Sequence, residues 1–254
     1  MTEPVTLLRR DSYKEWKKEE SFPFRGWDFS HLEGRAEWED PPWDYLSMAR
    51  ELVRNSKSLL DMGTGGGELL STLAPIPGRA AATELIPASV ELARRRLGPL
   101  GVEVIECDHD RGMPFDDGEF DLVLNRHSSL PLKEVSRVLC RGGTFLTQQV
   151  DSHDLWDLRK IFGVSCSGSN TLASVRRRLA KHGFEIGKAQ DWEGTESFKD
   201  VGAIVCFLRV VDCVVPGFSV DRHLACLEEL QRRLDRGERL VYSQKRFLIM
   251  ARKL

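Results

Sequence analysis

The sequence predicts an α/β fold with a doubly wound, mostly parallel seven-stranded sheet, helices on both of its faces, and an N-terminal cap. From about residue 41 onward, short apolar runs of strand length alternate with amphipathic segments of helix length. Four glycines within residues 63–67 separate the first of these strands from its helix. Strands and helices in this alternating order imply parallel strands that are covered on both faces.

The individual elements follow from local patterns. Pro41-Pro42 begins a predicted helix that reaches about Asn55. Backbone N–H groups in the first turn of a helix have no partner within the helix, so the N–H that proline lacks is not missed there. Ser58–Met62 is a short strand that the glycines end. Bounded apolar runs predict the other strands, and apolar residues spaced by three or four predict the other helices. The expected strands are 79–84, 102–106, 120–124, 144–150, 184–190 and 244–251. The expected helices are 68–73, 87–97, 131–139, 155–162, 171–182, 198–211 and 220–234.

The first forty residues differ from the rest of the chain. They carry aromatic residues between charged ones with little periodicity, and aromatic side chains gain much by burial. We therefore expect an irregular or short-helical cap over residues 1–40 and a second domain over residues 41–254. Trp27 and Phe29 of this cap are candidates for substrate contacts in a lid that excludes water. The alternative is a hydrophobic strap along the edge of the sheet.

Composition excludes several classes of protein. The formal net charge is −2, whereas proteins that bind nucleic-acid phosphates usually have a basic surplus. The six cysteines are scattered and form no C-x-x-C pair, so no metal site is expected. They are expected to be buried thiols in a reducing cytoplasm. The charged residues 1–20 have no apolar core of a signal peptide, and the apolar stretch 201–215 is too short to cross a bilayer. The sequence carries no signal for an oligomeric state.

The glycine cluster has the form Asp61-x-Gly63-x-Gly65-x-Gly67. Glycines are needed where a strand turns sharply into a helix and its backbone must approach a ligand. The dinucleotide fingerprint needs a further glycine at the sixth position, which is Glu68 here. The cluster therefore predicts a ligand loop of another kind.

This D-x-G-x-G-x-G form resembles the S-adenosylmethionine (SAM) loop of class I methyltransferases. Three later features resemble the same family in the same order: an acidic residue at the end of the second strand, the segment Glu106-Cys107-Asp108-His109-Asp110 with Met113-Pro114-Phe115, and the fourth strand with the helix and turn that follow. Together they cover about residues 43–150. The resemblance implies SAM as the cofactor, bound by Asp61, Gly63, Thr64, Gly65, Gly67, Glu84, Leu85, Asp108, His109 and Asn125.

The roles of the three carboxylates also follow from the resemblance. Asp61 accepts hydrogen bonds from the cationic amino-acid end of SAM, directly or through water. Glu84 binds both ribose hydroxyls, a bidentate task that suits a carboxylate. Asp108 accepts from the adenine amino group, and Asp110 is its rival for this role.

The acceptor is expected beside the loop after the fourth strand, residues 125–129, since ligands in open parallel sheets lie beyond the carboxyl ends of the strands. His127 is a candidate general base and substrate contact, although it is as well explained by packing or by a bond to backbone. Gln149, at the carboxyl end of the fifth strand, is a candidate pocket wall. The N-P-P-Y signature of amino-group DNA methylases is absent.

These features favour a methyltransferase that acts on an oxygen or nitrogen atom of a small molecule. One alternative is an RNA or protein methyltransferase, which the acidic charge balance disfavours. Another is a SAM-binding protein without catalytic activity, because cofactor binding does not prove turnover. A nicotinamide dehydrogenase is a fourth hypothesis, which Glu68 disfavours.

Overall fold

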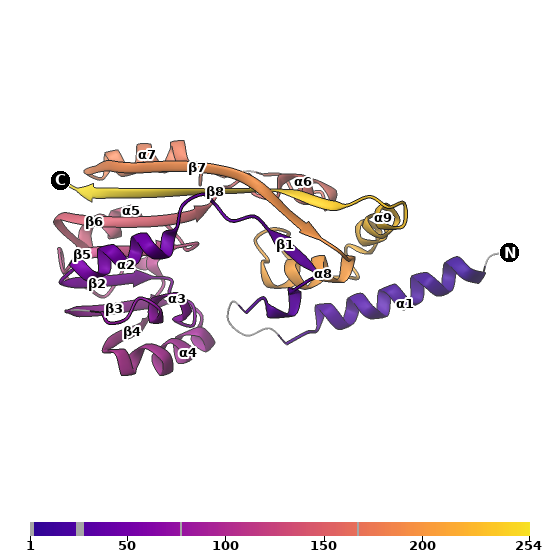
Figure 1. Ribbon diagram of the computed structural model, residues 1–254, viewed down its shortest axis with the longest axis horizontal. Helices are drawn as coiled ribbons and strands as arrows, with labels where there is room; N and C mark the ends of the chain where they lie inside the picture. The colour runs from indigo at the N-terminus through magenta and orange to yellow at the C-terminus, as the bar shows by residue number, and fades with distance from the viewer. Residues whose placement is uncertain (1–2, 24–27, 77, 167) are drawn as a thin grey trace. The chain divides into compact units, whose positions relative to one another are not determined.

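The computed structural model describes residues 3–23, 28–76, 78–166 and 168–254 (Figure 1). Its contacts divide the chain into two compact units. We call one the sheet unit, which comprises Pro41–Ser152, Gly168–Trp192 and Arg246–Leu254. The other, the helical unit, comprises the described residues of 1–40, 153–167 and 193–245.

The sheet unit contains a doubly wound parallel sheet. The chain starts in the middle with β2, adds β3 and β4 on one side, and then returns to add β5 and β6 on the other. These five strands are parallel, while β8 joins β6 in the antiparallel direction. The switch point lies between β2 and β5. The strands are β2 (Ser58–Met62), β3 (Arg79–Glu84), β4 (Val102–Glu106), β5 (Phe120–Arg126), β6 (Leu139–Val150), β7 (Phe184–Phe198) and β8 (Leu240–Lys253).

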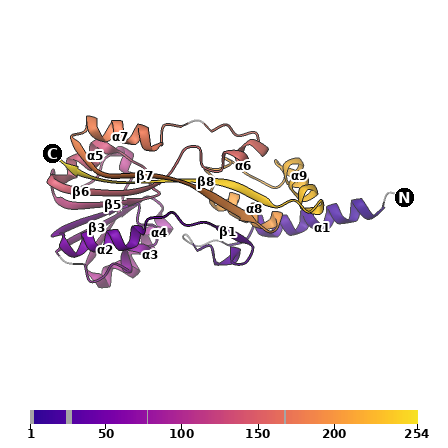
Figure 2. The ribbon, with the colours of Figure 1, turned by 45° about the horizontal axis from the view of Figure 1, so that its top comes forward.

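Helices cover both faces of this sheet (Figure 2). One face packs with α2, α3 and α4 into a core that includes Ala49, Leu70 and Leu97. The other face packs with α5 and α7 into a core that includes Val135 and Leu179. The bounds are α2 (Tyr45–Asn55), α3 (Glu68–Ser71), α4 (Pro87–Leu97), α5 (Leu132–Val138) and α7 (Leu172–Lys181), with short 3-10 turns η2 (Gly98–Leu100) and η3 (His109–Arg111).

The helical unit has its own hydrophobic core around α8, in which every residue from Val201 to Leu208 is buried. Within this unit β1 pairs antiparallel with the end of β7, Ala36 opposite Phe198. No helix in the described ranges combines the length and the apolar content needed to cross a membrane. The remaining elements are α1 (Glu3–Glu20), η1 (Ser30–Leu32), β1 (Ala36–Trp38), α6 (Trp156–Ile161), α8 (Val201–Val210) and α9 (Leu224–Asp235).

The predicted α/β class with a mostly parallel sheet is confirmed, with two differences. The sheet has eight strands rather than seven, because β1 adds a strand of three residues that is too short to show an alternating pattern. The division by contacts also falls between Asp40 and Pro41, but residues 153–167 and 193–245, which were expected in the second domain, join the N-terminal segment.

Several predicted ends also moved. The first part of the expected cap is a single helix of 18 residues. Its sequence is highly charged, but Tyr13 and Trp16 pack against the core of the helical unit. The helix expected from Pro41 begins at Tyr45, because Asp44 caps it through a bond from Ser47 N at 2.9 Å. The strand expected from residue 144 begins at Leu139 and passes through the two glycines that were expected to precede it.

Candidate functional site

The glycine loop follows β2 at the switch point of the sheet. Gly63, Gly65 and Gly67 have φ angles of +69°, +61° and +79°, which only glycine adopts without strain. The backbone N–H groups of Gly63 and Thr64 donate to the carbonyl of Thr83 at 2.9 and 3.0 Å. The loop is therefore held against the end of β3 by its own backbone.

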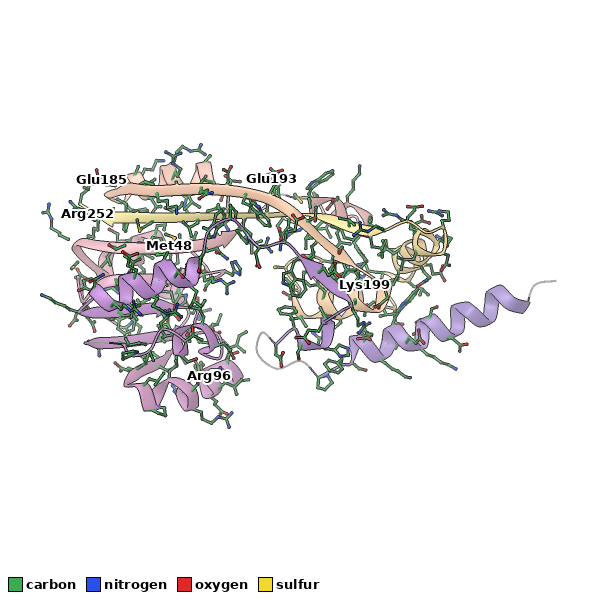
Figure 3. All side chains as sticks on the ribbon, viewed as in Figure 1. Met48, Arg96, Glu185, Glu193, Lys199 and Arg252 are labelled. Atoms are coloured by element: carbon green, nitrogen blue, oxygen red, sulfur yellow. The ribbon has the colours of Figure 1, made fainter. Side chains whose placement is uncertain are left out.

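Arg96 of α4, labelled in Figure 3, fixes the far side of the loop. Its guanidinium donates to the carbonyl of Gly66 and forms an ion pair of 2.6 Å with Glu68. The acidic residue that breaks the dinucleotide fingerprint thus has a structural partner.

Ser128, from the loop after β5, lies directly against Gly63. A methyl group at position 63 would overlap the Ser128 hydroxyl and lie 2.5 Å from its Cβ. We expect Gly63→Ala to destabilise the fold by about 1–3 kcal/mol, because strain at positive φ and overpacking add. Urea unfolding of Gly142→Ala is the matched control, since Gly142 has a φ of +79° and no atom within 4 Å. Equal losses for the two variants would contradict the packing against Ser128, and Ser128→Gly should rescue only the Gly63 variant.

Glu84 ends β3 and is buried beneath the loop. One carboxylate oxygen accepts from Gly65 N at 2.9 Å, and the other accepts from Leu85 N and Ile86 N at 2.9 and 3.0 Å. A single carboxylate therefore connects the glycine loop to the turn after β3. Leu85 and Ile86 are 56% and 54% exposed, so they leave an apolar surface open beside this carboxylate.

Asp61, on β2 two residues before the loop, is 6% exposed. Burial raises the pKa of its carboxyl to about 6; the Thr64 hydroxyl opposes this shift and the charge of Glu84 adds to it. A carboxylate held this far from water is stabilised by a cation that approaches it. This property suits the role predicted for Asp61.

The segment after β4 contains Asp108, His109 and Asp110. Asp108 caps η3 by accepting from Asp110 N at 3.1 Å, and it lines a cavity of about 610 Å³ with Met113 and Pro114. Asp110 is exposed. His109 is buried, and its Nε2 lies 2.6 Å from the Thr83 hydroxyl. Burial lowers the pKa of His109, although the carboxylates around it oppose this shift.

Asn125 and Gln149 lie in an internal network rather than at an open surface. Asn125 is fully buried; its side-chain oxygen accepts from Thr147 at 3.1 Å and from Gln149, and its nitrogen donates to Ser129 O at 3.2 Å. Gln149 is 3% exposed and also donates to Thr147. Direct ligand contacts by these two side chains stay predictions, and this burial disfavours them.

The neighbouring residue, Gln148, contacts His127 instead. Its side-chain nitrogen lies 3.1 Å from His127 Nε2, and its side-chain oxygen accepts from Trp43 Nε1 at 2.7 Å. His127 itself has a φ of +56° although it is not glycine. Sequence reasoning did not single out Trp43 or Ser128, and of the two glutamines at the end of β6 it selected Gln149 rather than Gln148. The alternation of β6 carried a signal for Gln148, because it places Gln148 on the face opposite to Gln149.

The two cap residues fare differently. Trp27 lies outside the described residues. Phe29 packs in the helical unit, where its ring lies 6.0 Å from that of Trp38 and 6.4 Å from that of Phe207. A substrate role for either residue stays a prediction.

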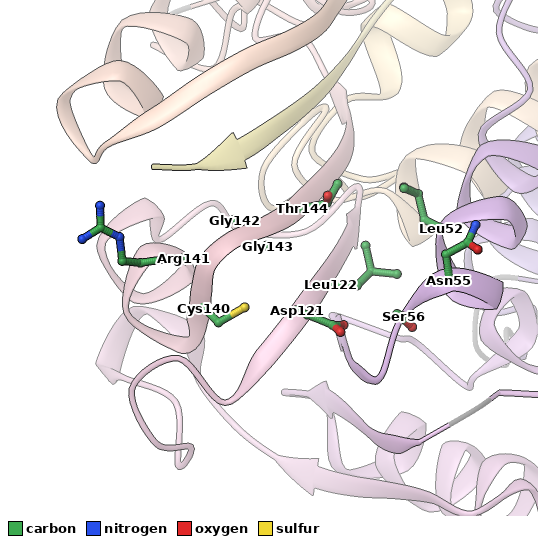
Figure 4. A pocket seen from close by; sticks show the side chains of 10 residues that line it. All are labelled: Leu52, Asn55, Ser56, Asp121, Leu122, Cys140, Arg141, Gly142, Gly143 and Thr144. Atoms are coloured by element: carbon green, nitrogen blue, oxygen red, sulfur yellow. The ribbon is translucent and has the colours of Figure 1, made fainter.

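A second cavity, of about 350 Å³, opens at the other end of the sheet (Figure 4). Asp121, Cys140 and Arg141 line it, near the amino ends of β5 and β6. Ligands in open parallel sheets lie at the carboxyl ends. We therefore assign the cavity no part in the candidate site.

One group of potential metal ligands occurs in the described part of the chain, formed by Glu19, His31 and Cys206 of the helical unit. Arg35 lies among them, 2.8 Å from the Glu19 carboxylate and 3.3 Å from His31 Nε2. Burial raises the pKa of the Cys206 thiol to about 11. The guanidinium of Arg35 already supplies a positive charge to this group, and the Cys206 thiol favours its protonated form. Both properties disfavour a metal ion there.

Comparison with known proteins agrees with this geometry. Residues 60–147 match the family model described as a methyltransferase domain. A probable phthiotriol/phenolphthiotriol dimycocerosates methyltransferase 2 of Mycobacterium ulcerans is 30% identical over 132 residues, which are 42% of this chain and 51% of that protein. The chain therefore matches about half the length of this relative.

Solved structures share the fold. A putative methyltransferase from Bacillus halodurans has a TM-score of 0.60 at 20% identity, with 82% of this chain and 96% of the other covered. A geranyl diphosphate methyltransferase, in complex with geranyl diphosphate and sinefungin, has a TM-score of 0.51 at 18% identity, with 82% of this chain and 76% of the other covered.

The doubly wound sheet with the glycine loop at its switch point is a Rossmann-like fold. The match over residues 60–147, together with the fold shared with solved methyltransferases, supports a class I SAM-dependent methyltransferase domain in this part of the chain.

Proposed function

We propose that the chain binds SAM on the loop of residues 61–68 and methylates an oxygen or nitrogen atom of a small-molecule acceptor. The observation that carries this proposal is the junction of the glycine loop with Glu84. Both lie at the carboxyl ends of adjacent parallel strands, where doubly wound sheets bind ligands.

The side chains at this edge fit the groups of the cofactor. Glu84 offers two carboxylate oxygens for the ribose. The backbone N–H groups of Gly65 and Leu85 donate to this carboxylate and hold it in place. Leu85 and Ile86 offer an apolar surface for the adenine ring, and Asp108, which lines the cavity after β4, offers an acceptor for the adenine amino group. Asp61 offers a buried carboxylate for the cationic amino-acid end. When bound, SAM supplies an electrophilic methyl group on a sulfonium.

A small acceptor is supported by charge and by the relatives. A net charge of −2 gives no basic surplus for nucleic acid. The names of the similar proteins refer to dimycocerosates of phthiotriol and to geranyl diphosphate, which are lipids and a small isoprenoid. A cytoplasmic location is part of the proposal, supported by six cysteines that are all free.

Calorimetric titration of the chain with SAM, S-adenosylhomocysteine and NAD tests this function. We expect binding of SAM and its product with a Kd between about 1 and 100 μM, within the usual range for enzyme ligands, and no binding of NAD. Binding of NAD without SAM would overturn the proposal. Binding of SAM without transfer to any metabolite or RNA pool would favour a non-catalytic SAM-binding protein.

A further inference from the structure

His127 is held by its main chain in a conformation that non-glycine residues rarely adopt. Its φ is +56°, and its N–H donates to the carbonyl of Gln148 at 2.9 Å. A left-handed residue with a side chain costs about 1–2 kcal/mol. Such conformations persist where the surroundings enforce them, and they concentrate at functional sites.

The side chains of Trp43, Gln148 and His127 form a hydrogen-bonded chain with one possible polarity. The indole N–H of Trp43 only donates, so the atom of Gln148 that lies 2.7 Å from it is the amide oxygen. The amide nitrogen of Gln148 then faces His127 Nε2 at 3.1 Å. An amide nitrogen only donates, so His127 Nε2 accepts, and the neutral ring carries its proton on Nδ1.

The reverse arrangement is unfavourable in both of its forms. A flipped amide would turn its nitrogen toward the Trp43 N–H, and a protonated His127 would turn an N–H toward the Gln148 nitrogen. Each form places two donors against each other, and a buried donor without an acceptor costs about 1–3 kcal/mol. Trp43 and Gln148 are 7% and 5% exposed, so water does not readily replace the lost partner.

Two cations lie on the same face and edge of the sheet. Arg126 is opposite Gln148 in the pairing of β5 with β6, and Arg246 is opposite Val150 in the pairing of β6 with β8. Residues two apart in a strand share a face of the sheet. Leu124 and Leu248 lie on the face that packs with α2. Arg126 and Arg246, each two residues from one of these leucines, therefore lie on that same face. Partial desolvation and these two charges hold the pKa of His127 well below its usual value, even though the residue is exposed.

We propose that Trp43 and Gln148 are positioning residues that hold His127 as a neutral Nδ1–H donor, and that the methyl acceptor presents a carboxylate to this donor and to Arg126 and Arg246. The proposal rests on the methyltransferase function proposed above. It replaces the general base expected at His127 with a hydrogen-bond donor, because the only lone pair of the neutral ring is occupied by Gln148.

A carboxylate acceptor needs no base. One of its oxygens forms the new O–C bond with a lone pair, the C–S bond of the sulfonium breaks, and its electron pair stays on sulfur. The products are a methyl ester and a neutral thioether, and no proton is transferred. An alcohol would have to lose a proton. The hydrogen-bonded side chains of Trp43, Gln148 and His127 offer no acceptor for this proton.

The tautomer is tested without any ligand by nitrogen-15 NMR of histidine-labelled protein, with His127 assigned from the peak that His127→Gln removes. We expect protonated Nδ1 and unprotonated Nε2 in the native chain near neutral pH. Gln148→Glu should move the proton to Nε2 and raise the pKa of His127 by about one unit or more, because a carboxylate partner favours the charged ring. Gln190→Glu, the same change elsewhere in the sheet unit, should leave both unchanged. A native His127 with protonated Nε2 would overturn the positioning role.

The acceptor class is tested by S-adenosylhomocysteine formation from matched sets: benzoate, benzamide and benzyl alcohol, and octanoate, octanamide and octanol. We expect transfer to the acids only, and a rise in KM of about tenfold or more for Arg126→Gln, a loss of about 1.4 kcal/mol. Arg141→Gln, which removes the same charge at the opposite end of β6, is the control. Transfer to the alcohols or amides would overturn the carboxylate assignment while the methyltransferase function stands.

Binding is also read without turnover. Benzoate should shift the His127 resonances of the native chain, and the double variant Arg126→Gln/Arg246→Gln should show no shift. If benzoate and octanoate leave His127 of the native chain unshifted, the carboxylate assignment falls. If SAM itself does not bind in the calorimeter, the proposed function falls instead.

Discussion

Glu84→Ala is expected to weaken SAM binding at least about 100-fold, a loss of about 2.7 kcal/mol. The side chain has two duties in the structure. It is the carboxylate proposed for the ribose, and it accepts three backbone N–H groups that shape the turn after β3 and the glycine loop. Alanine leaves Gly65, Leu85 and Ile86 with unpaired donors, so the binding site loses both a contact and its shape.

Glutamine separates these two duties in part. In Glu84→Gln the amide oxygen still accepts from Leu85 N and Ile86 N, whereas the amide nitrogen faces Gly65 N, so the two-oxygen acceptor for the ribose is lost. Affinity should fall about tenfold, or 1.4 kcal/mol, and the urea midpoint should fall less than in Glu84→Ala, because fewer backbone donors lose their acceptor. Glu185→Ala is the matched control, because Glu185 begins β7 away from this site and is exposed. Calorimetry on the three variants, with urea unfolding in parallel, decides the matter. Native SAM affinity in Glu84→Ala would show that the cofactor binds elsewhere.

The parallel part of the fold was predictable because local signals agreed there. The strands Ser58–Met62, Arg79–Glu84 and Val102–Glu106 and the helix Pro87–Leu97 have the bounds expected from sequence. Each is short, apolar on its buried face, and bounded by glycine, proline or a charged residue. Local preference and tertiary packing specify the same structure in such segments.

The late strands were less predictable, because their pattern changes along their length. The expected strand over 184–190 continues to Phe198, and the last strand begins at Leu240 instead of 244. Most of the extra residues, 193–198 of β7 and 240–243 of β8, belong to the helical unit, where the end of β7 pairs with β1. A periodicity read over seven residues does not reveal this change of environment.

The candidate site shows the same division. The three loop glycines follow from spacing, because positive φ requires glycine at fixed positions in the chain. Asp61 and Glu84 follow from the resemblance to class I methyltransferases. Gln148 and Trp43 are 105 residues apart and meet only after folding. Their polarity depends on which atoms face each other, and no sequence pattern encodes that.

Asp61→Asn is expected to stabilise the ligand-free protein and to weaken SAM binding. The unfolded chain titrates this carboxyl at its ordinary pKa of 3.8, whereas burial raises the pKa to about 6 in the folded protein. The folded state therefore binds this proton more tightly, and stability falls as the pH rises from 3.8 to 6. Above pH 6 the ionised carboxylate costs about 3 kcal/mol, from two pKa units at about 1.4 kcal/mol each. Asparagine has the shape of the protonated acid without this cost, so the gain at pH 7 should be about 1–3 kcal/mol.

The loss of affinity has the same origin. A cation that binds beside Asp61 offsets the cost of its charge, so the native chain should bind SAM more weakly as the pH falls below 6, by up to about tenfold per pH unit. The Asp61→Asn variant should bind SAM at least about tenfold more weakly at pH 7. Its affinity should no longer fall as the pH decreases below 6, because the titrating carboxyl is absent. Asp116→Asn, the same change in an exposed turn, should alter neither property. Thermal unfolding and calorimetry between pH 5 and 8 give both quantities for the same samples. An Asp61→Asn protein that is less stable at pH 7, or that binds SAM as the native chain does, would show that burial of this carboxylate serves packing and not the cofactor.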